Sequence, residues 1–167
     1  MSLHFSDKEF SSRKLKVLKS MKKQNIDALL MFKQESMYWL TGYDSFGFVF
    51  FQTLILKNDG EIILLTRAPD LRQAQNTSNI EDIRIWVDKD GSNPADDLKN
   101  ILEELSLKGK KIGVEYEAYG LTGRNTLRLN KSLEIYCNIE DQSELITKLR
   151  VIKSPEEIAY VKKAAEL

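Results

Sequence analysis

Two apolar runs separated by four turn-forming residues constrain the fold of this chain more than any other feature. Residues 47–56 and 61–66 are mostly apolar, and Lys57-Asn58-Asp59-Gly60 lies between them. An Asp-Gly pair between apolar runs is a strong hairpin signal, because glycine readily accepts the positive φ that a tight turn needs. The sequence therefore predicts two antiparallel strands joined by this turn.

The remaining patterns alternate between strand and helix periodicity. Further strands are predicted over residues 26–31, 82–87, 111–116 and 132–137. Helices are predicted over residues 34–40, 70–75, 93–107 and 122–129. Alternation of this kind is typical of an α/β domain, and the hairpin makes the sheet mixed rather than purely parallel.

A helix is also predicted near the N-terminus. Ser6 and Glu9 have the spacing of a capping box, in which each side chain binds the other residue's backbone N–H. Four apolar residues then fall on one helical face and are expected to pack on the sheet: Phe10, Leu15, Leu18 and Met21. The lysine-rich opposite side is interpreted as a solvated face.

Composition limits the classes of partner. The 25 basic residues equal the 25 acidic ones, so no global field favours nucleic acid or an anionic membrane. A single cysteine, Cys137, excludes an intrachain disulfide and fits a reducing compartment. No signal-peptide pattern is seen at the N-terminus, and the apolar run over residues 47–56 is too short to span a bilayer. We therefore expect a cytoplasmic protein.

Residues suited to catalysis are few. His4 is the single histidine, so a zinc site or a histidine-activated nucleophile has little to build on. A site made only of carboxylates for Mg or Mn is conceivable. Its candidates lie near expected strand ends or loops: Asp44, Asp70, Asp88, Asp90, Glu115 and Glu117. With 25 acidic residues in the chain, a solvated surface is the favoured interpretation of these carboxylates.

Two stretches are candidates for ligand binding. Tyr43, Asp44 and Phe46 lie in an expected loop between a helix and a strand, where aromatic and polar groups commonly form binding sites. Arg67 and Arg72 follow a strand and could hold a carboxylate in bidentate geometry. Structural explanations compete with both: the aromatic residues could form core and turn, Arg67 could pair with Asp70 or Asp44, and Arg72 could be a surface helix residue.

The last segment contains strong signals for the start of a helix. Ser154 suits the N-cap, Pro155 the first turn, and Ser154 with Glu157 forms a second capping-box pair. The sequence stops at Leu167 without an end signal, so we expect the polypeptide to continue. We divide the chain into a domain over residues 1–148 and a linker with the start of a further helix over residues 149–167.

This linker carries a resemblance to a known family. The phrase LRVIKSPEEI at residues 149–158 is similar to the segment that joins the two domains of creatinases, prolidases and aminopeptidases P, the pita-bread metallohydrolases. Three upstream phrases, at residues 26–30, 38–43 and 112–116, fit the same family in the same order. The resemblance covers essentially the whole chain.

Several expectations follow from that resemblance. It implies a three-layer domain with a mixed, ribonuclease-H-like sheet, which assists dimerisation and covers an active-site cleft. It places two divalent metal ions (Mn, Co or Zn), held by two Asp, one His and two Glu, in a C-terminal catalytic domain absent from this sequence. No residue here is therefore assigned as catalytic or as a metal ligand, and the chain alone is expected to be inactive.

The function expected of the intact protein is hydrolysis of Xaa-Pro peptide bonds, with a homodimer as the assembly. An alternative within the family is a hydrolase of C–N bonds in a small molecule, similar to creatinase or ectoine hydrolase. A free-standing binding module with the same fold is a further alternative. A carboxylate-only nuclease of the ribonuclease-H type is disfavoured by the balanced charge.

Overall fold

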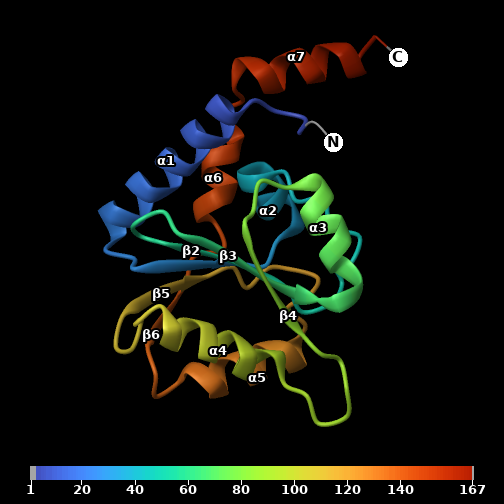
Figure 1. Ribbon diagram of the computed structural model, residues 1–167. Coiled ribbons are helices and arrows are strands. Elements are labelled where there is room, and N and C mark those ends of the chain that lie inside the picture. The colour runs from blue at the N-terminus through green and yellow to red at the C-terminus, as the bar shows by residue number, and fades with distance from the viewer. Residues whose placement is uncertain (1–2, 167) are drawn as a thin grey trace.

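Three layers make up the domain in the computed structural model, which describes residues 3–166 (Figure 1). A six-stranded sheet lies in the middle, with helices α1, α2, α3 and α6 on one face and α4 and α5 on the other. The expected three-layer α/β class with a mixed sheet is confirmed.

The strand order is β4-β3-β2-β1-β5-β6. The strands are β1 (Ala28–Met31), β2 (Thr53–Lys57), β3 (Ile62–Arg67), β4 (Asp82–Trp86), β5 (Lys111–Val114) and β6 (Asn138–Asp141). Among these six strands, β2 alone runs opposite to the rest, because it pairs antiparallel with both β1 and β3. The carboxyl ends of the five parallel strands therefore meet at one edge of the sheet.

Helices fill the connections between the strands. Their bounds are α1 (Asp7–Gln24), α2 (Gln34–Thr41), α3 (Leu71–Thr77), α4 (Pro94–Glu104), α5 (Gly123–Leu133), α6 (Leu145–Val151) and α7 (Pro155–Ala164). A short 3₁₀ turn, η1 (Ala68–Asp70), precedes α3. Helix α7 lies beyond the first turn of α1, away from the sheet (Figure 1).

Strand β1 divides the core into two parts. Leu29 and Met31 pack toward α1, α2 and α6, whereas Ala28 and Leu30 pack toward α4 and α5. All four side chains are fully buried, as expected for a central strand with both faces covered. The two-residue period of a strand thus supplies both faces of the sheet with apolar side chains.

The turn signal is confirmed, and so is the capping box at α7, but the predicted box at α1 is only half formed, because the Ser6 backbone N–H donates to Glu156 and the Glu9 carboxylate binds Arg13. Gly60 adopts a φ of +96° in the hairpin turn between β2 and β3. The side chain of Ser6 accepts a hydrogen bond from the Glu9 backbone N–H at the start of α1. At the start of α7, Ser154 and Glu157 form a complete capping box.

One strand prediction is wrong at its start, and another is wrong over its whole length. The predicted strand over residues 47–56 begins only at Thr53, because residues 47–52 form a turn and an irregular segment before β2. The predicted strand over residues 132–137 is also wrong: α5 continues to Leu133, and the strand β6 follows at Asn138. In both places a short apolar run predicts a strand, but periodicity alone does not distinguish a strand from other structures in runs of this length.

The expected division at residue 148 falls inside α6, whose Leu145 and Ile146 are buried in the core. That boundary stays a prediction. The two predicted segments also include Met1, Ser2 and Leu167, which lie outside the described residues.

The buried face of α1 differs from the predicted face by a small rotation. Phe10 and Met21 are buried as expected, but Arg13 and Val17 complete the buried set. Leu15 is 66% exposed. The apolar pattern does not predict this rotation, because the pattern selects Leu15 for the buried face, whereas the structure buries the charged Arg13 there.

We predict that Val17→Ala lowers the free energy of unfolding by roughly 2 kcal/mol, because it removes two methyl groups from a fully packed site. Leu15→Ala on the same helix should change it by less than about 0.5 kcal/mol. Urea unfolding of both variants measures the difference. Equal losses would show that the helix face is assigned incorrectly.

Candidate functional site

The candidate site is the carboxyl edge of the sheet, where the parallel strands end. Ligands of open α/β sheets generally bind outside these strand ends. The segment that we call the edge loop, residues 42–52, runs along this edge between α2 and β2. It begins at Gly42, whose φ of +82° ends α2.

The inner side of the edge loop is a buried polar network. Tyr43 is completely buried, and its hydroxyl donates to Gln52 Oε1 at 2.8 Å. Gln52 Nε2 donates to the Ser45 hydroxyl, and the Thr66 hydroxyl donates to Gln52 Oε1. Burial raises the pKa of Tyr43. The structure thus turns Tyr43 inward, and its contact with a substrate stays a prediction.

The outer side of the loop presents Asp44 and Phe46. Both side chains are exposed, and Phe46 is 87% exposed. Their backbone N–H groups donate to Thr77 Oγ1 and Gln73 Oε1 of α3, respectively. The loop therefore holds an aromatic ring in solvent on a backbone that is fixed by hydrogen bonds.

Arg67 and Arg72 have different surroundings. Arg67 pairs with Asp70 at 3.1 Å, and its guanidinium lies 3.4 Å from the ring centre of Phe50. This confirms the ion pair that competed with the ligand-binding interpretation. Arg72 is exposed on α3 and forms no ion pair with any residue in the described range 3–166.

Further apolar groups are exposed around the same edge. Val49 and Phe50 lie in the edge loop, and Tyr119, which is 75% exposed, packs against Phe48 edge to face. Beside them is a hollow of about 380 Å³, whose lining includes Phe48, Tyr119, Lys33 and Arg150. The hollow therefore combines aromatic surface with two cationic side chains and the carboxylates of Glu35 and Glu117, the second of which lies 3.4 Å from Lys33 Nζ.

Sequence reasoning missed Lys33, Tyr119 and Arg150. A signal was available for the first two, because each follows the end of a predicted parallel strand. Arg150 comes to the hollow from α6, which no local pattern could place there.

Glu115 is buried directly behind this edge. It follows β5, and its carboxylate accepts from the backbone N–H of Lys33 at 3.1 Å and from the Ser36 hydroxyl at 2.6 Å. The side chain therefore ties the end of β5 to the first turn of α2. Burial raises the pKa of Glu115 to about 7, although both hydrogen bonds act in the opposite direction.

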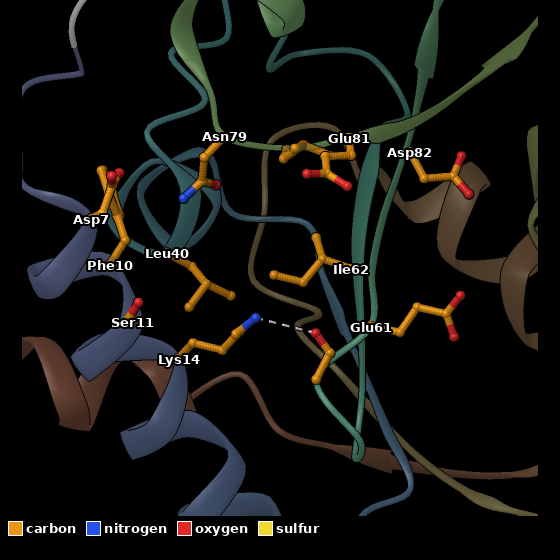
Figure 2. A pocket seen from close by; sticks show the side chains of 12 residues that line it. Asp7, Phe10, Ser11, Lys14, Leu40, Glu61, Ile62, Asn79, Glu81 and Asp82 are labelled. Carbon is orange, nitrogen blue, oxygen red and sulfur yellow. Dashed lines mark hydrogen bonds between the residues drawn. The ribbon is translucent and has the colours of Figure 1, made fainter.

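A second hollow, of about 490 Å³, lies between α1 and the β2–β3 hairpin. Figure 2 shows apolar side chains, including Phe10, Leu40 and Ile62, together with the carboxylates of Asp7 and Glu81. The ammonium group of Lys14 lies 3.5 Å from the Gly60 carbonyl oxygen. None of the five residues proposed for substrate contact lines this hollow.

The donor groups of the described residues do not fit the expected metal chemistry. Within residues 3–166, no three His, Cys, Asp or Glu side chains gather in a group that could hold a metal ion. These residues therefore do not provide the site for the two divalent ions that the family resemblance implies. In the same range, none of the helices has the length and apolar character needed to cross a membrane.

Close packing of the edge loop against Gly120 generates one prediction. A Cβ at Gly120 would clash with the carbonyl oxygen of Phe50, whereas a Cβ at Gly123 meets no atom within 4 Å. We expect Gly120→Ala to lower the free energy of unfolding by about 2 kcal/mol, the usual range for overpacking. Gly123→Ala should leave it unchanged or raise it slightly. Thermal or urea unfolding tests the pair, and equal stabilities would contradict the close contact.

Glu115 generates a second prediction. Because its pKa is raised from 4.5 to about 7, the folded chain binds more protons than the unfolded chain between these pH values. The free energy of unfolding should therefore fall as the pH rises through this range, by up to about 3 kcal/mol from this group.

Glu115→Gln replaces the titrating carboxyl group with an uncharged amide of nearly the same shape. The difference in stability between the parent chain and this variant should shift in favour of the variant from pH 5 to pH 8. Urea unfolding across this range measures it, and parallel pH profiles would contradict the prediction.

Comparison with known proteins identifies the domain. Residues 13–152 match the family described as Creatinase/Prolidase N-terminal domain. The chain is 33% identical over 169 residues to an uncharacterized hydrolase/peptidase, y4tM, from Sinorhizobium fredii, covering 97% of this chain and 43% of that protein. It is 29% identical over 174 residues to the ectoine hydrolase of Halomonas elongata, covering 100% of this chain and 43% of that enzyme.

Solved structures share the fold. A prolidase from Thermococcus sibiricus superposes with a TM-score of 0.77 at 23% identity, over 94% of this chain and 41% of that one. An aminopeptidase P from Streptococcus thermophilus gives a TM-score of 0.65 at 20% identity, over 84% of this chain and 98% of that one. The sequence match over residues 13–152 shows that the chain belongs to the creatinase/prolidase N-terminal domain family.

Proposed function

We propose that this chain is the non-catalytic, active-site-covering and assembly domain of a longer metal-dependent hydrolase that cleaves Xaa-Pro peptide bonds. The observation that carries the proposal is the family match over residues 13–152, with the chain spanning 43% of each curated relative. Relatives of solved structure named as a prolidase and an aminopeptidase P support the Xaa-Pro substrate class.

The surface that faces the substrate in this proposal is the outer side of the edge loop. Phe46 offers an exposed apolar ring, and Asp44 a neighbouring carboxylate. Arg67 and Arg72 are secondary candidates, because Arg67 is already engaged by Asp70 and Phe50 and Arg72 lies on the adjoining helix. Tyr43 acts from the interior by linking the two ends of the loop through its hydrogen bond with the Gln52 side chain.

The remaining parts of the proposal come from the family resemblance. Two divalent metal ions, Mn, Co or Zn, bind in the catalytic domain of the intact protein. That domain is the main partner of this chain, and the intact protein is a homodimer. A cytoplasmic location is supported by the presence of one cysteine, Cys137, in the sequence.

A second candidate function is hydrolysis of a C–N bond in a small molecule. It is favoured by the 29% identity to an ectoine hydrolase over the whole of this chain. The hollow of about 380 Å³ at the edge, with cationic and acidic side chains around aromatic ones, also suits a small zwitterion.

The test uses a longer protein encoded by the same reading frame, loaded with Mn, Co or Zn. Phe46→Ala should raise KM for its substrate roughly tenfold, the effect of losing an anchoring aromatic contact worth about 1.4 kcal/mol. Ile135→Ala is the matched control, because Ile135 is 96% exposed at the opposite edge of the sheet.

Xaa-Pro dipeptides and ectoine, assayed in parallel, distinguish the two candidate functions. The 167-residue chain alone should hydrolyse neither of them with any of the three metals. Metal-dependent turnover by this chain would contradict the proposal, as would equal KM values for the Phe46 and Ile135 variants.

A further inference from the structure

A buried arginine joins three separate segments on the α1 side of the domain. Arg13, in the middle of α1, is fully buried, and its Nε donates to Glu9 Oε1 at 2.8 Å. Its Nη1 donates to the carbonyl oxygen of Trp39 at 2.8 Å, near the end of α2. The ring of Phe5 covers the guanidinium at 4.0 Å.

Glu157, in the first turn of α7, completes this cluster. Its Oε1 accepts from the Trp39 indole N–H at 3.0 Å and lies 3.3 Å from Arg13 Nη2. The second distance is that of an ion pair, although no described residue accepts a hydrogen bond from Nη2. Oε2 accepts from the Ser154 backbone N–H, so one carboxylate both caps α7 and docks it.

Helix α7 has little else to hold it. None of its described residues is buried. Glu156 accepts hydrogen bonds from Ser6, and the Tyr160 hydroxyl donates to the His4 carbonyl oxygen, but both hydrogen bonds are exposed. The Tyr160 ring also packs edge to face against Phe5, with the ring centres 5.3 Å apart. The partly buried contact of Glu157 with Arg13 and Trp39 therefore connects α7 to the buried guanidinium and to α2.

The same cluster also holds the start of the edge loop. Arg13 fixes the backbone of Trp39, and the edge loop begins three residues later at Gly42. If Trp39 moves, Tyr43 is expected to move with it, because the intervening residues Leu40 and Thr41 are buried and closely packed. The direction of α7 and the position of the edge loop therefore depend on one shared anchor.

We propose that Glu157 is a positioning residue, which couples the direction of α7 to the edge loop through Arg13 and Trp39. Without the Glu157 carboxylate, Arg13 keeps its ion pair with Glu9, but its buried Nη2 loses the carboxylate that lies 3.3 Å away. The coupling itself is independent of the proposed function; that the edge loop faces a substrate rests on it.

Glu157→Gln tests the coupling in this chain. A glutamine still completes a capping box, so α7 keeps its first turn. It cannot satisfy Arg13 and Trp39 equally, because the amide is uncharged and offers one acceptor oxygen. Glu156→Gln is the matched control, because Glu156 is the adjacent carboxylate and its hydrogen bonds go to Ser6 alone among the described residues.

The measurement is the NMR spectrum and amide hydrogen exchange of both variants. For Glu157→Gln, we expect exchange in residues 158–165 to accelerate roughly tenfold or more, and the amide and aromatic signals of residues 43–46 to shift. Glu156→Gln should leave residues 43–46 unchanged. A Glu157→Gln spectrum altered only in α7 would overturn the proposal.

Trp39→Phe provides a second variant in case Glu157→Gln does not fold. It removes the indole hydrogen bond with Glu157 and leaves the Arg13 bonds to Glu9 and to the backbone of residue 39. It should shift the signals of both α7 and residues 43–46, and effects confined to its immediate neighbours would overturn the coupling.

In a catalytically active longer protein, Glu157→Gln should also raise KM more than it lowers kcat. If the longer protein without substitutions hydrolyses neither substrate, the proposed function is contradicted, and the spectroscopic result is unaffected.

Discussion

Helix α2 is held at both ends by buried charged side chains, and the arrangement of the carboxyl edge depends on this constraint. The carboxylate of Glu115 binds at its first turn, and the guanidinium of Arg13 binds the Trp39 carbonyl oxygen in its last turn. The ionised form of Glu115 at the amino end and the positive charge of Arg13 at the carboxyl end both match the helix dipole. A helix of eight residues would not be stable alone, so these contacts and its packing hold it in place.

The two anchors connect different parts of the domain. Glu115 follows β5, which lies between β1 and the edge strand β6, whereas Arg13 comes from α1 and reaches α7 through Glu157. The edge loop starts where α2 ends, so its first residues inherit a position that both anchors set. The first residues of the loop are thus held in place through α2, while outer side chains such as Phe46 lie in solvent.

Local signals predicted the fold where they had a single structural meaning. Asp59-Gly60 placed the hairpin, and Ser6 and Ser154 placed the starts of α1 and α7. The errors occurred where an apolar run had several meanings: residues 47–52 hold exposed aromatic residues as well as core, and residues 132–137 end a helix before a strand begins. Only the three-dimensional packing distinguishes these cases.

The site was predicted less completely than the fold, because its key contacts join residues far apart in the sequence. The sequence showed that Arg67 could pair with Asp70 three residues later, and the structure contains this pair. Glu115 was one of several carboxylates, and nothing local indicated that it would be buried against α2. The pairing of Arg13 with Glu157 spans most of the chain and required a buried charge that the apolar pattern did not suggest.

The edge loop reverses the usual distribution of side chains, and this reversal supports a binding role. Its buried side contains a polar network, in which Tyr43, Ser45 and Gln52 satisfy one another, next to the core residue Phe51, while Phe46 is exposed to solvent. An exposed ring contributes little to stability, whereas a buried polar network must be satisfied completely to avoid a penalty. Folding alone would favour the opposite arrangement. A surface that exposes Phe46 and Phe50, on a backbone fixed by hydrogen bonds, has the physical properties of one that another molecule covers.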